Sequence, residues 1–231
     1  MSTVLPAAVL WDMDGTLVDT EPYWMEAEYA LVAEHGGSWD DDHAHALVGN
    51  PLRVSAEYIR RHGGVDLPVD EVVERLLAHV VVRVGERPPW RPGALELLAD
   101  LGRVGVPCAL VTMSWTSLAE AVVSALPAGT FAAVVTGDEV TYGKPHPEPY
   151  LTAAARLGVD PAECVAVEDS PTGLLSAEAA GAVAVGVPHL VPLPTRPGRI
   201  LLSSLAGVTA ADLGRLVSAR TTRRYRSVSE P

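Results

Sequence analysis

The chain has 231 residues, with 17 Lys and Arg against 29 Asp and Glu, 48% hydrophobic residues and two cysteines. Its length allows one large domain or two small ones, and a chain of this size buries a core without disulfides or a structural metal. The hydrophobic content excludes a disordered chain, and the net charge of −12 argues against binding to nucleic acid or an anionic membrane, because both require a basic face.

Five short apolar runs are predicted to be strands of one sheet, at residues 7–11, 108–111, 132–135, 164–167 and 182–187. These runs are continuous rather than alternating, which is typical of parallel strands that are covered on both faces. Stretches with helical spacing separate the later runs, at residues 94–103, 116–126, 148–157 and 172–180. This alternation predicts a doubly wound, parallel, Rossmann-like α/β sheet, in which ligands bind beyond the carboxyl ends of the strands.

The segment between the first strand and the next predicted core helix is unusually long, at about eighty residues. It contains four stretches with helical spacing, at residues 22–34, 41–48, 52–61 and 69–84. Because a structureless loop of this length is uncommon in a compact domain, we predict a helical insertion. The predicted domains are therefore an α/β catalytic core of residues 1–19 and 91–231, and a small helical cap domain of residues 20–90.

Two carboxylates, Asp12 and Asp14, directly follow the first predicted strand. Gly15 comes next and permits a tight turn in which the backbone approaches a ligand closely. Taken alone, this string also fits an Asx turn without any catalytic role. A calcium-binding EF-hand loop is excluded, because it needs a third acidic position before its glycine and a distal glutamate.

The second and third strands are also followed by polar groups. Thr112, Met113, Ser114 and Trp115 follow the second strand and precede a helix. Hydroxyls and backbone N–H groups at a helix N-terminus are suited to hold an anion, although an ordinary helix cap by Ser114 is an alternative. Lys144 follows the third strand in a proline-stiffened loop, where it would either neutralise phosphate or remain a solvated lysine.

Two adjacent acids, Glu168 and Asp169, follow the fourth strand. Placed opposite Asp12 and Asp14, they would repel strongly unless a cation lay between them. An all-oxygen set of this kind favours Mg²⁺, which retains water molecules and binds substrate phosphate. Four separate signals at four successive strand ends therefore combine into one strong prediction of a phosphate and metal site.

The motifs DMDGTLVDTE, LVTMS, GKPHPEPY and VAVEDSPTGLLSAEAAG, in this order, resemble the haloacid dehalogenase (HAD) superfamily, in its phosphatase branch with an inserted helical (C1-type) cap. The resemblance covers essentially the whole chain. It implies an Mg²⁺-dependent phosphomonoester hydrolase that acts on a small phosphorylated metabolite. By this resemblance, Asp12 is the nucleophile that forms an aspartyl-phosphate, and Asp14 is the general acid and base.

The resemblance also implies which residues hold the phosphate and the metal. Thr112 and Lys144 would hold the transferring phosphoryl group, and Met113 and Gly15 complete the expected phosphate site. Mg²⁺ would be bound by Asp12, the backbone carbonyl of Asp14 and Asp169, with Glu168 supporting from the edge. The candidates for the substrate pocket are Trp24, Asn50, Arg53, Ser114 and Trp115.

Three rival functions compete with the hydrolase. Asp14 argues against a dehalogenase, whose chemistry lacks that acid/base aspartate. β-Phosphoglucomutase shares the cap type and motif order, but Trp24 replaces its usual histidine and its cap lysine and arginine are absent, with Arg53 one place late. A phospho-receiver signalling module would carry its phosphoacceptor after the third strand and has no place for the insertion. The mutase is therefore the nearest alternative.

No apolar run approaches the roughly 18–20 residues of a membrane span, and residues 1–6 do not resemble a signal peptide. Cys108 and Cys164 lie within apolar runs, which is typical of small buried residues rather than of a disulfide or a catalytic thiol. The basic tail around Arg220 is interpreted as a frayed, solvated end. We therefore expect a cytoplasmic protein with no membrane or nucleic-acid partner, whose oligomeric state and exact substrate stay open.

Overall fold

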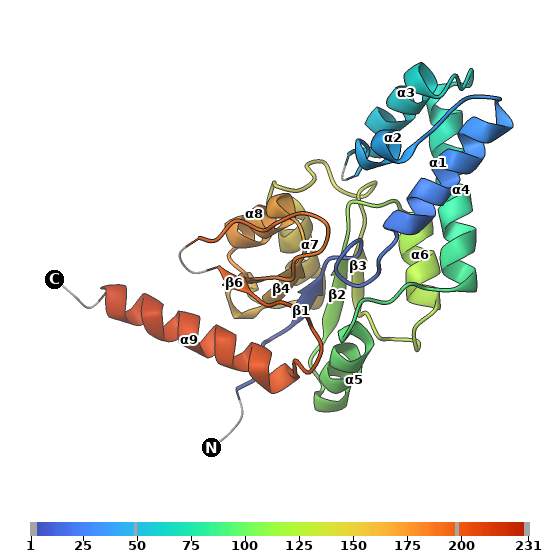
Figure 1. The fold of residues 1–231 in the computed structure, drawn as a ribbon. Coiled ribbons are helices and arrows are strands. Elements are labelled where there is room, and N and C mark those ends of the chain that lie inside the picture. Colours follow the sequence, from blue (N-terminus) through green and yellow to red (C-terminus); the bar gives the residue numbers. More distant parts are fainter. Residues whose placement is uncertain (1–3, 49, 197–198, 229–231) are drawn as a thin grey trace. The chain divides into compact units, whose positions relative to one another are not determined.

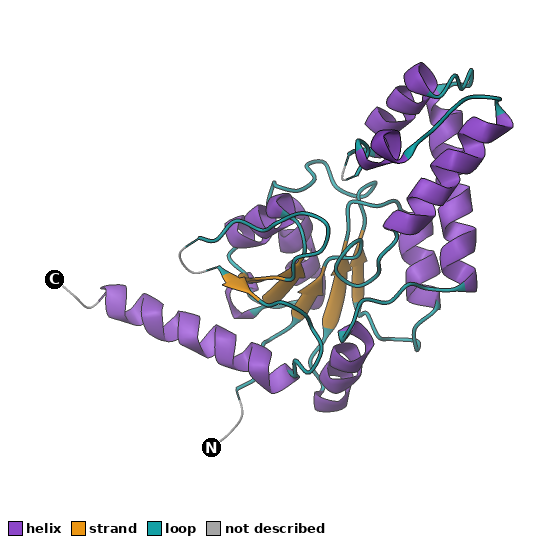
Figure 2. Ribbon diagram, viewed as in Figure 1, coloured by secondary structure: helices purple, strands orange, loops and turns teal. Residues whose placement is uncertain are grey.

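The structure is a computed structural model that describes residues 4–48, 50–196 and 199–228, with side chains described as far as residue 220. The chain divides into two compact units. The core unit comprises Met1–Asp19 and Trp90–Pro231, and the insertion comprises Thr20–Pro89. Figure 2 shows that the strands belong to the core unit and that the described part of the insertion is built from helices.

The core unit is organised around a six-stranded parallel sheet in the order β3-β2-β1-β4-β5-β6 (Figure 1). Its strands are β1 (Val9–Trp11), β2 (Cys108–Val111), β3 (Ala133–Val135), β4 (Val165–Glu168), β5 (Val183–Gly186) and β6 (Ile200–Leu201). The chain winds from β1 to β3 on one side and from β4 to β6 on the other, so the direction reverses between β1 and β4. The predicted doubly wound α/β fold is confirmed, and its ligand crevice is expected at this reversal.

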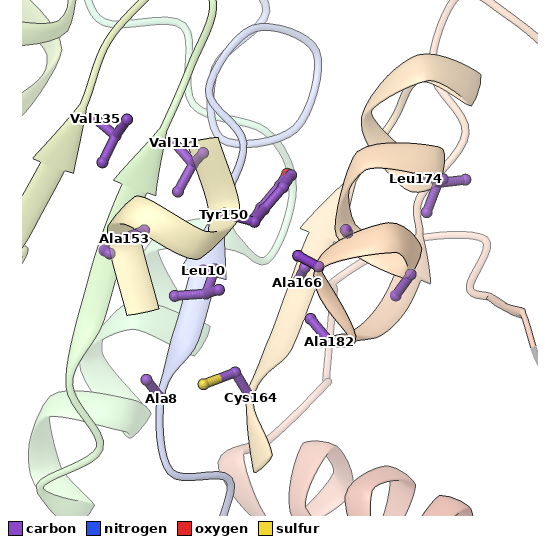
Figure 3. Packing of buried hydrophobic residues seen from close by; sticks show 14 of the residues in the cluster. Ala8, Leu10, Val111, Val135, Tyr150, Ala153, Cys164, Ala166, Leu174 and Ala182 are labelled. Atoms are coloured by element: carbon purple, nitrogen blue, oxygen red, sulfur yellow. The ribbon is translucent and has the colours of Figure 1, made fainter. Parts of the chain in front are cut away.

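The helices of the core unit are α5 (Ala94–Val104), α6 (Thr116–Ser124), α7 (Glu148–Leu157), the 3₁₀ turn η1 (Pro161–Glu163), α8 (Pro171–Ala180) and α9 (Ala210–Val228). Helices α7 and α8 contact each other and cover one face of the sheet. On that face, Leu10, Val111 and Ala166 of the strands belong to one buried hydrophobic cluster with Tyr150 of α7 and Leu174 of α8 (Figure 3). Because these strand positions are fully buried, a charged substitution at any of them would destabilise the sheet.

The insertion contains α1 (Glu21–Glu34), α2 (Asp41–His45), α3 (Leu52–His62) and α4 (Val69–Glu86). Helix α4 packs against both α1 and α3. The shared interior is apolar, with Leu31 and Val32 of α1, Ile59 of α3, and Leu76 and Val80 of α4 all at most 5% exposed. The insertion therefore has a hydrophobic core of its own, as a helical domain requires.

Three elements described in the core unit were not predicted from the sequence, namely η1, β6 and α9. A two-residue strand is too short to show a hydrophobic period, whereas α9 begins with a readable signal. The Oδ2 atom of Asp212 accepts a hydrogen bond from the N–H of Thr209 at 2.9 Å, and the Thr209 hydroxyl accepts one from the N–H of Asp212 at 3.2 Å. This reciprocal pair is a capping box, which marks the start of a helix.

The interpretation of Arg220 as part of a frayed, solvated end is wrong. Arg220 lies on α9, and its guanidinium donates hydrogen bonds to the backbone carbonyls of Gly181 at 2.9 Å and Ala182 at 2.5 Å. Gly181 is the C-cap of α8 and Ala182 follows it, so the guanidinium lies at the C-terminus of that helix, where a cation interacts favourably with the helix dipole. None of the described helices is both long and apolar enough to cross a membrane.

Candidate active site

The site lies at the carboxyl ends of β1, β2 and β4, which are neighbours in the sheet. Asp12 and Thr112 each continue the ladder by one residue beyond their strands. The N–H of Asp12 donates to Val167 O at 3.0 Å, and the N–H of Thr112 donates to Val135 O at 2.9 Å. These backbone bonds fix both residues at the sheet edge, where Asp12 is 7% exposed and Thr112 is 1% exposed.

A tight turn after β1 brings Asp14 and Gly15 to the same edge. The N–H of Gly15 donates to Val18 O at 2.7 Å, and the N–H of Val18 donates to Met13 O at 3.0 Å. Gly15 has a φ of +86°, and a Cβ atom added there would lie 2.0 Å from Oδ2 of Asp169. Glycine is therefore required at this position, because it admits both the left-handed turn and the approach of the loop to Asp169.

Lys144 lies at the centre of the site, although it is 132 positions away from Asp12 in the sequence. Its Nζ atom donates to Oδ1 of Asp12 at 2.6 Å, to Oε1 of Glu168 at 2.6 Å and to the carbonyl of Val111 at 2.9 Å. The side chain is 5% exposed. Burial alone would lower the pKa of Lys144, but the charges of Asp12 and Glu168 raise that pKa above its ordinary value, so the ammonium form is retained.

The sequence carries a further signal for Lys144, because it is the only lysine among the 17 Lys and Arg residues of the chain. An ammonium group offers three donors from one compact centre, whereas a guanidinium is a broad planar fork. The three acceptors around Nζ therefore explain why lysine rather than arginine stands here.

Glu168 is fully buried, and both of its carboxylate oxygens accept hydrogen bonds from protein donors. Oε1 accepts from Lys144 and from the Tyr150 hydroxyl, the latter at 2.7 Å, and Oε2 accepts from the Ser170 hydroxyl at 3.0 Å. These contacts suit Glu168 to hold Lys144 in place. Tyr150 and Ser170 were not predicted from the sequence, although Ser170 carries the signal of an N-cap followed by proline at the first helical position.

Three carboxylates, from Asp12, Glu168 and Asp169, form a cluster whose potential ligand atoms all lie within 4.8 Å of one another. Oδ2 of Asp12 is buried and has no hydrogen-bond partner among the described residues. Burial, followed by the negative charge of Glu168, raises the pKa of Asp12 to about 7. Burial and the charge of Asp12 raise the pKa of Asp169 to about 8. An anionic, all-oxygen cluster with a buried, unpartnered oxygen fits a hard divalent cation.

Asp14 occupies a different environment from Asp12. It is half-buried, and its Oδ2 atom accepts hydrogen bonds from the Ser114 hydroxyl at 2.7 Å and from the Thr112 hydroxyl at 3.3 Å. Asp12 is instead paired with the ammonium of Lys144. Two nearby carboxylates in unlike environments are suited to different chemical roles, one as a nucleophile and one as a proton donor.

The alternative reading of Ser114 as an ordinary helix cap is wrong. Helix α6 has Trp115 at its N-cap with no side-chain cap from that residue, and Asp138 Oδ1 accepts a hydrogen bond from the N–H of Thr116 at 3.1 Å. Asp138 therefore caps α6, and the Ser114 hydroxyl instead donates its hydrogen bond to Asp14. Met113 contacts the Lys144 loop, since its Sδ atom accepts a hydrogen bond from the N–H of Lys144 at 3.3 Å.

Three of the predicted substrate-pocket residues belong to the insertion. Trp24 lies on α1 and is half-buried, and the side-chain amide of Asn50 donates to the carbonyl of Ala46 at 3.0 Å. Arg53 forms an exposed ion pair with Asp70. The roles of these residues, and that of Trp115 in the core unit, stay predictions.

In the absence of divalent cations, the free energy of unfolding is expected to fall as the pH rises from about 4 to about 8. The folded-state pKa values of Asp12 and Asp169, about 7 and about 8, exceed their ordinary value of 3.8. The folded chain therefore binds more protons than the unfolded chain over this range. Because a bound cation removes the need for those protons, Mg²⁺ is expected to raise the Tm more at about pH 8.5 than at about pH 6.

Thermal melting in Mg²⁺ and in a chelator, at both pH values, measures this difference. The variant Asp169→Asn serves as the matched control, since it removes one carboxylate of the cluster and should reduce the Mg²⁺-induced change in Tm. A Tm increase that is as large at the lower pH as at the higher pH would contradict the assignment of the cluster as a cation site.

The sequence of this chain is similar to a known protein family and to several characterised phosphatases. The family model described as haloacid dehalogenase-like hydrolase matches residues 6–181. Hexitol phosphatase B of Escherichia coli K12 is 34% identical over 216 residues, which cover 89% of this chain and 96% of that protein. Validoxylamine A 7'-phosphate phosphatase of Streptomyces hygroscopicus subsp. limoneus is 34% identical, covering 77% of this chain and 84% of that protein.

A solved structure supports the same relationship. The crystal structure of CbbY from Rhodobacter sphaeroides in complex with phosphate superposes with a TM-score of 0.79 and 29% sequence identity. The superposition covers 90% of this chain and 99% of that chain. The similarity therefore extends over nearly the full length of both proteins.

Proposed function

The chain belongs to the haloacid dehalogenase-like hydrolases, and we propose that this phosphoric monoester hydrolase cleaves the phosphate ester of a small metabolite, with Mg²⁺, through an aspartyl-phosphate on Asp12. The observation that carries the proposal is the buried Oδ2 atom of Asp12, which has no partner among the described residues while Oδ1 is held by Lys144. A carboxylate held on one oxygen presents the other to an electrophile or a cation. The phosphatases named among the similar proteins support the same chemistry.

Asp12 begins the reaction by attacking phosphorus through a carboxylate oxygen. The bond between phosphorus and the ester oxygen breaks, and the carboxyl proton of Asp14 passes to that oxygen, so that the alcohol leaves uncharged. Thr112 lies beside Asp14 and Lys144 lies beside Asp12. The Thr112 hydroxyl would hold a phosphoryl oxygen, and the ammonium of Lys144 would hold the phosphoryl group by offsetting its negative charge. Asp14, now ionised, takes a proton from the water that hydrolyses the aspartyl-phosphate.

The donor set fits Mg²⁺, with Asp12, Asp169 and the backbone carbonyl of Asp14 as the residues that would hold it. When bound, the ion offsets the negative charge that gathers as a carboxylate meets a phosphate. Glu168 is committed to Lys144, Tyr150 and Ser170, so it supports the site through these contacts. The fully buried Tyr150 has a pKa well above its ordinary value, because of burial and the charge of Glu168, and so remains a neutral hydrogen-bond donor.

Release of inorganic phosphate from a panel of metabolite monoesters, with Mg²⁺ or with a chelator, tests the proposed function. The panel includes hexitol phosphates, sugar phosphates and β-glucose 1-phosphate. We expect Mg²⁺-dependent release from small monoesters, and the ranking of kcat/KM identifies the substrate class. Absence of release from every ester would refute the phosphatase function.

The same panel separates the hydrolase from its nearest alternative. Formation of glucose 6-phosphate from β-glucose 1-phosphate, without net release of phosphate, would identify a mutase. Stable phosphorylation by a small phosphodonor without turnover would instead indicate a signalling module. A cytoplasmic location is part of the proposal and agrees with a small-metabolite substrate.

A further inference from the structure

Two hydroxyls of the described residues donate to Oδ2 of Asp14, and the contact from Ser114 Oγ, at 2.7 Å, is shorter than that from Thr112, at 3.3 Å. We propose that Ser114 is a positioning residue for Asp14, and that its hydroxyl sets the orientation in which the Asp14 carboxyl delivers its proton to the leaving oxygen. The inference rests on the proposed phosphatase function and assigns Ser114 a role other than contact with the substrate.

The hydroxyls of Thr112 and Ser114 have different roles at Asp14. The Thr112 hydroxyl is 3.3 Å from Oδ2 of Asp14, a long contact for an O–H donor, so it is readily exchanged for a contact with a phosphoryl oxygen. The Ser114 contact has an ordinary length for such a bond and stays in place. Because the Ser114 hydroxyl donates to Oδ2, it restrains the rotation of the Asp14 carboxyl group and so sets the direction in which that group faces the leaving oxygen.

Both backbone polar groups of Ser114, its N–H and its carbonyl, are hydrogen-bonded, and these bonds fix the position from which its hydroxyl reaches Asp14. The N–H of Ser114 donates to the Thr112 hydroxyl at 2.9 Å, and the carbonyl of Ser114 accepts from the N–H of Gly137 at 3.0 Å. A Cβ atom added at Gly137 would lie 2.1 Å from the carbonyl oxygen of Met113, so only glycine permits this approach. Since Asp138 caps α6, the Ser114 hydroxyl is not needed for the helix.

Proton transfer from Asp14 accelerates cleavage most when the alcohol is a poor leaving group. As the bond to phosphorus breaks, an alkyl alcohol needs a proton on its oxygen, whereas p-nitrophenolate leaves as a stable anion. A residue that positions the acid should therefore affect alkyl esters much more than p-nitrophenyl phosphate. A residue that contacts the phosphoryl group should affect all esters equally, because every substrate carries that group.

The test compares Ser114→Ala with the wild type, with Mg²⁺ present, on p-nitrophenyl phosphate and on the best alkyl monoester of the panel. The parameter compared is kcat/KM, which reports the steps through release of the alcohol and leaves out the later hydrolysis of the aspartyl-phosphate. We expect kcat/KM to fall about tenfold or more for the alkyl ester and less than about threefold for p-nitrophenyl phosphate. Ser114→Thr, which restores a hydroxyl, should recover most of the loss.

Ser117→Ala is the matched control, since Ser117 lies three residues along on an exposed face of α6 and should show wild-type kinetics. Equal losses on both esters, or a failure of Ser114→Thr to recover activity when its Tm is that of the wild type, would overturn the positioning role. A wild-type enzyme that hydrolyses neither ester would instead refute the proposed function, so the two failures are distinguishable.

Discussion

The variant Asp12→Asn is expected to lose turnover by a factor of the order of 10⁴ or more while its fold stays intact. An amide has no anionic oxygen with which to attack phosphorus, and no other described carboxylate combines a buried, unpartnered oxygen with a contact to Lys144. Phosphate release from the best ester measures the loss. Mass spectrometry of the acid-quenched wild type should detect a phosphorylated chain, and the variant should show none.

The stability of the same variant distinguishes a lost nucleophile from a lost fold. Burial and the charge of Glu168 raise the pKa of Asp12 to about 7, so its ionised form is disfavoured in the folded chain without a cation. The asparagine amide of the variant would keep an oxygen for Lys144 and remove that buried charge. We therefore expect the Tm in a chelator at about pH 8.5 to be unchanged or higher, because the ionised carboxylate is gone.

Asp66→Asn is the matched control, because it makes the same chemical change at an exposed position of the insertion. It should leave both turnover and Tm at the wild-type values. Unaltered phosphate release by Asp12→Asn would remove Asp12 from the mechanism. A large fall in its Tm would show that the carboxylate supports the fold rather than the chemistry.

Lys144→Met is expected to have the largest effect on stability, in addition to a loss of activity of about 10²–10³-fold. Methionine has a similar length but no charge, so Asp12 and Glu168 would remain buried without their shared ammonium. Leaving a buried charge unpaired costs about 3–5 kcal/mol, which corresponds to a fall in Tm of about 10 °C for a chain of this size. Thermal and urea unfolding measure this cost.

The change of the stability of Lys144→Met with pH provides an independent test. Without the ammonium, the pKa of Asp12, which is already raised to about 7, rises further because Lys144 no longer lowers it. The folded chain then binds more protons than the unfolded chain, and stability falls as the pH increases. The destabilisation should therefore be larger at about pH 8.5 than at about pH 6, and Mg²⁺ should reverse part of it. Arg103→Met, which removes a cation from a side chain that is 72% exposed, should change Tm little. A Lys144→Met protein as stable as this control would refute the central role of the ammonium.

The polar residues that follow the strands could be predicted because their signal is local. A short continuous apolar run identifies a buried parallel strand, and the residue that follows it lies at the sheet edge whatever the rest of the chain does. This pattern placed Asp12, Thr112 and Glu168 correctly at the ends of β1, β2 and β4. The capping box of Thr209 and Asp212 is equally local, so α9 was within reach of the sequence.

The contacts between these residues were decided by the tertiary structure. The order β3-β2-β1-β4 sets which strand ends are neighbours, and α7 and α8 pack across one face of that sheet. In this arrangement Lys144 contacts Asp12 and Tyr150 contacts Glu168. The sequence by itself determined which chemical groups stand at the sheet edge, because strand pattern and turn residues act over a few positions. The tertiary structure decided which hydroxyl serves Asp14 and which oxygen of Asp12 lacks a partner among the described residues, because side-chain direction follows from packing between segments far apart in the chain.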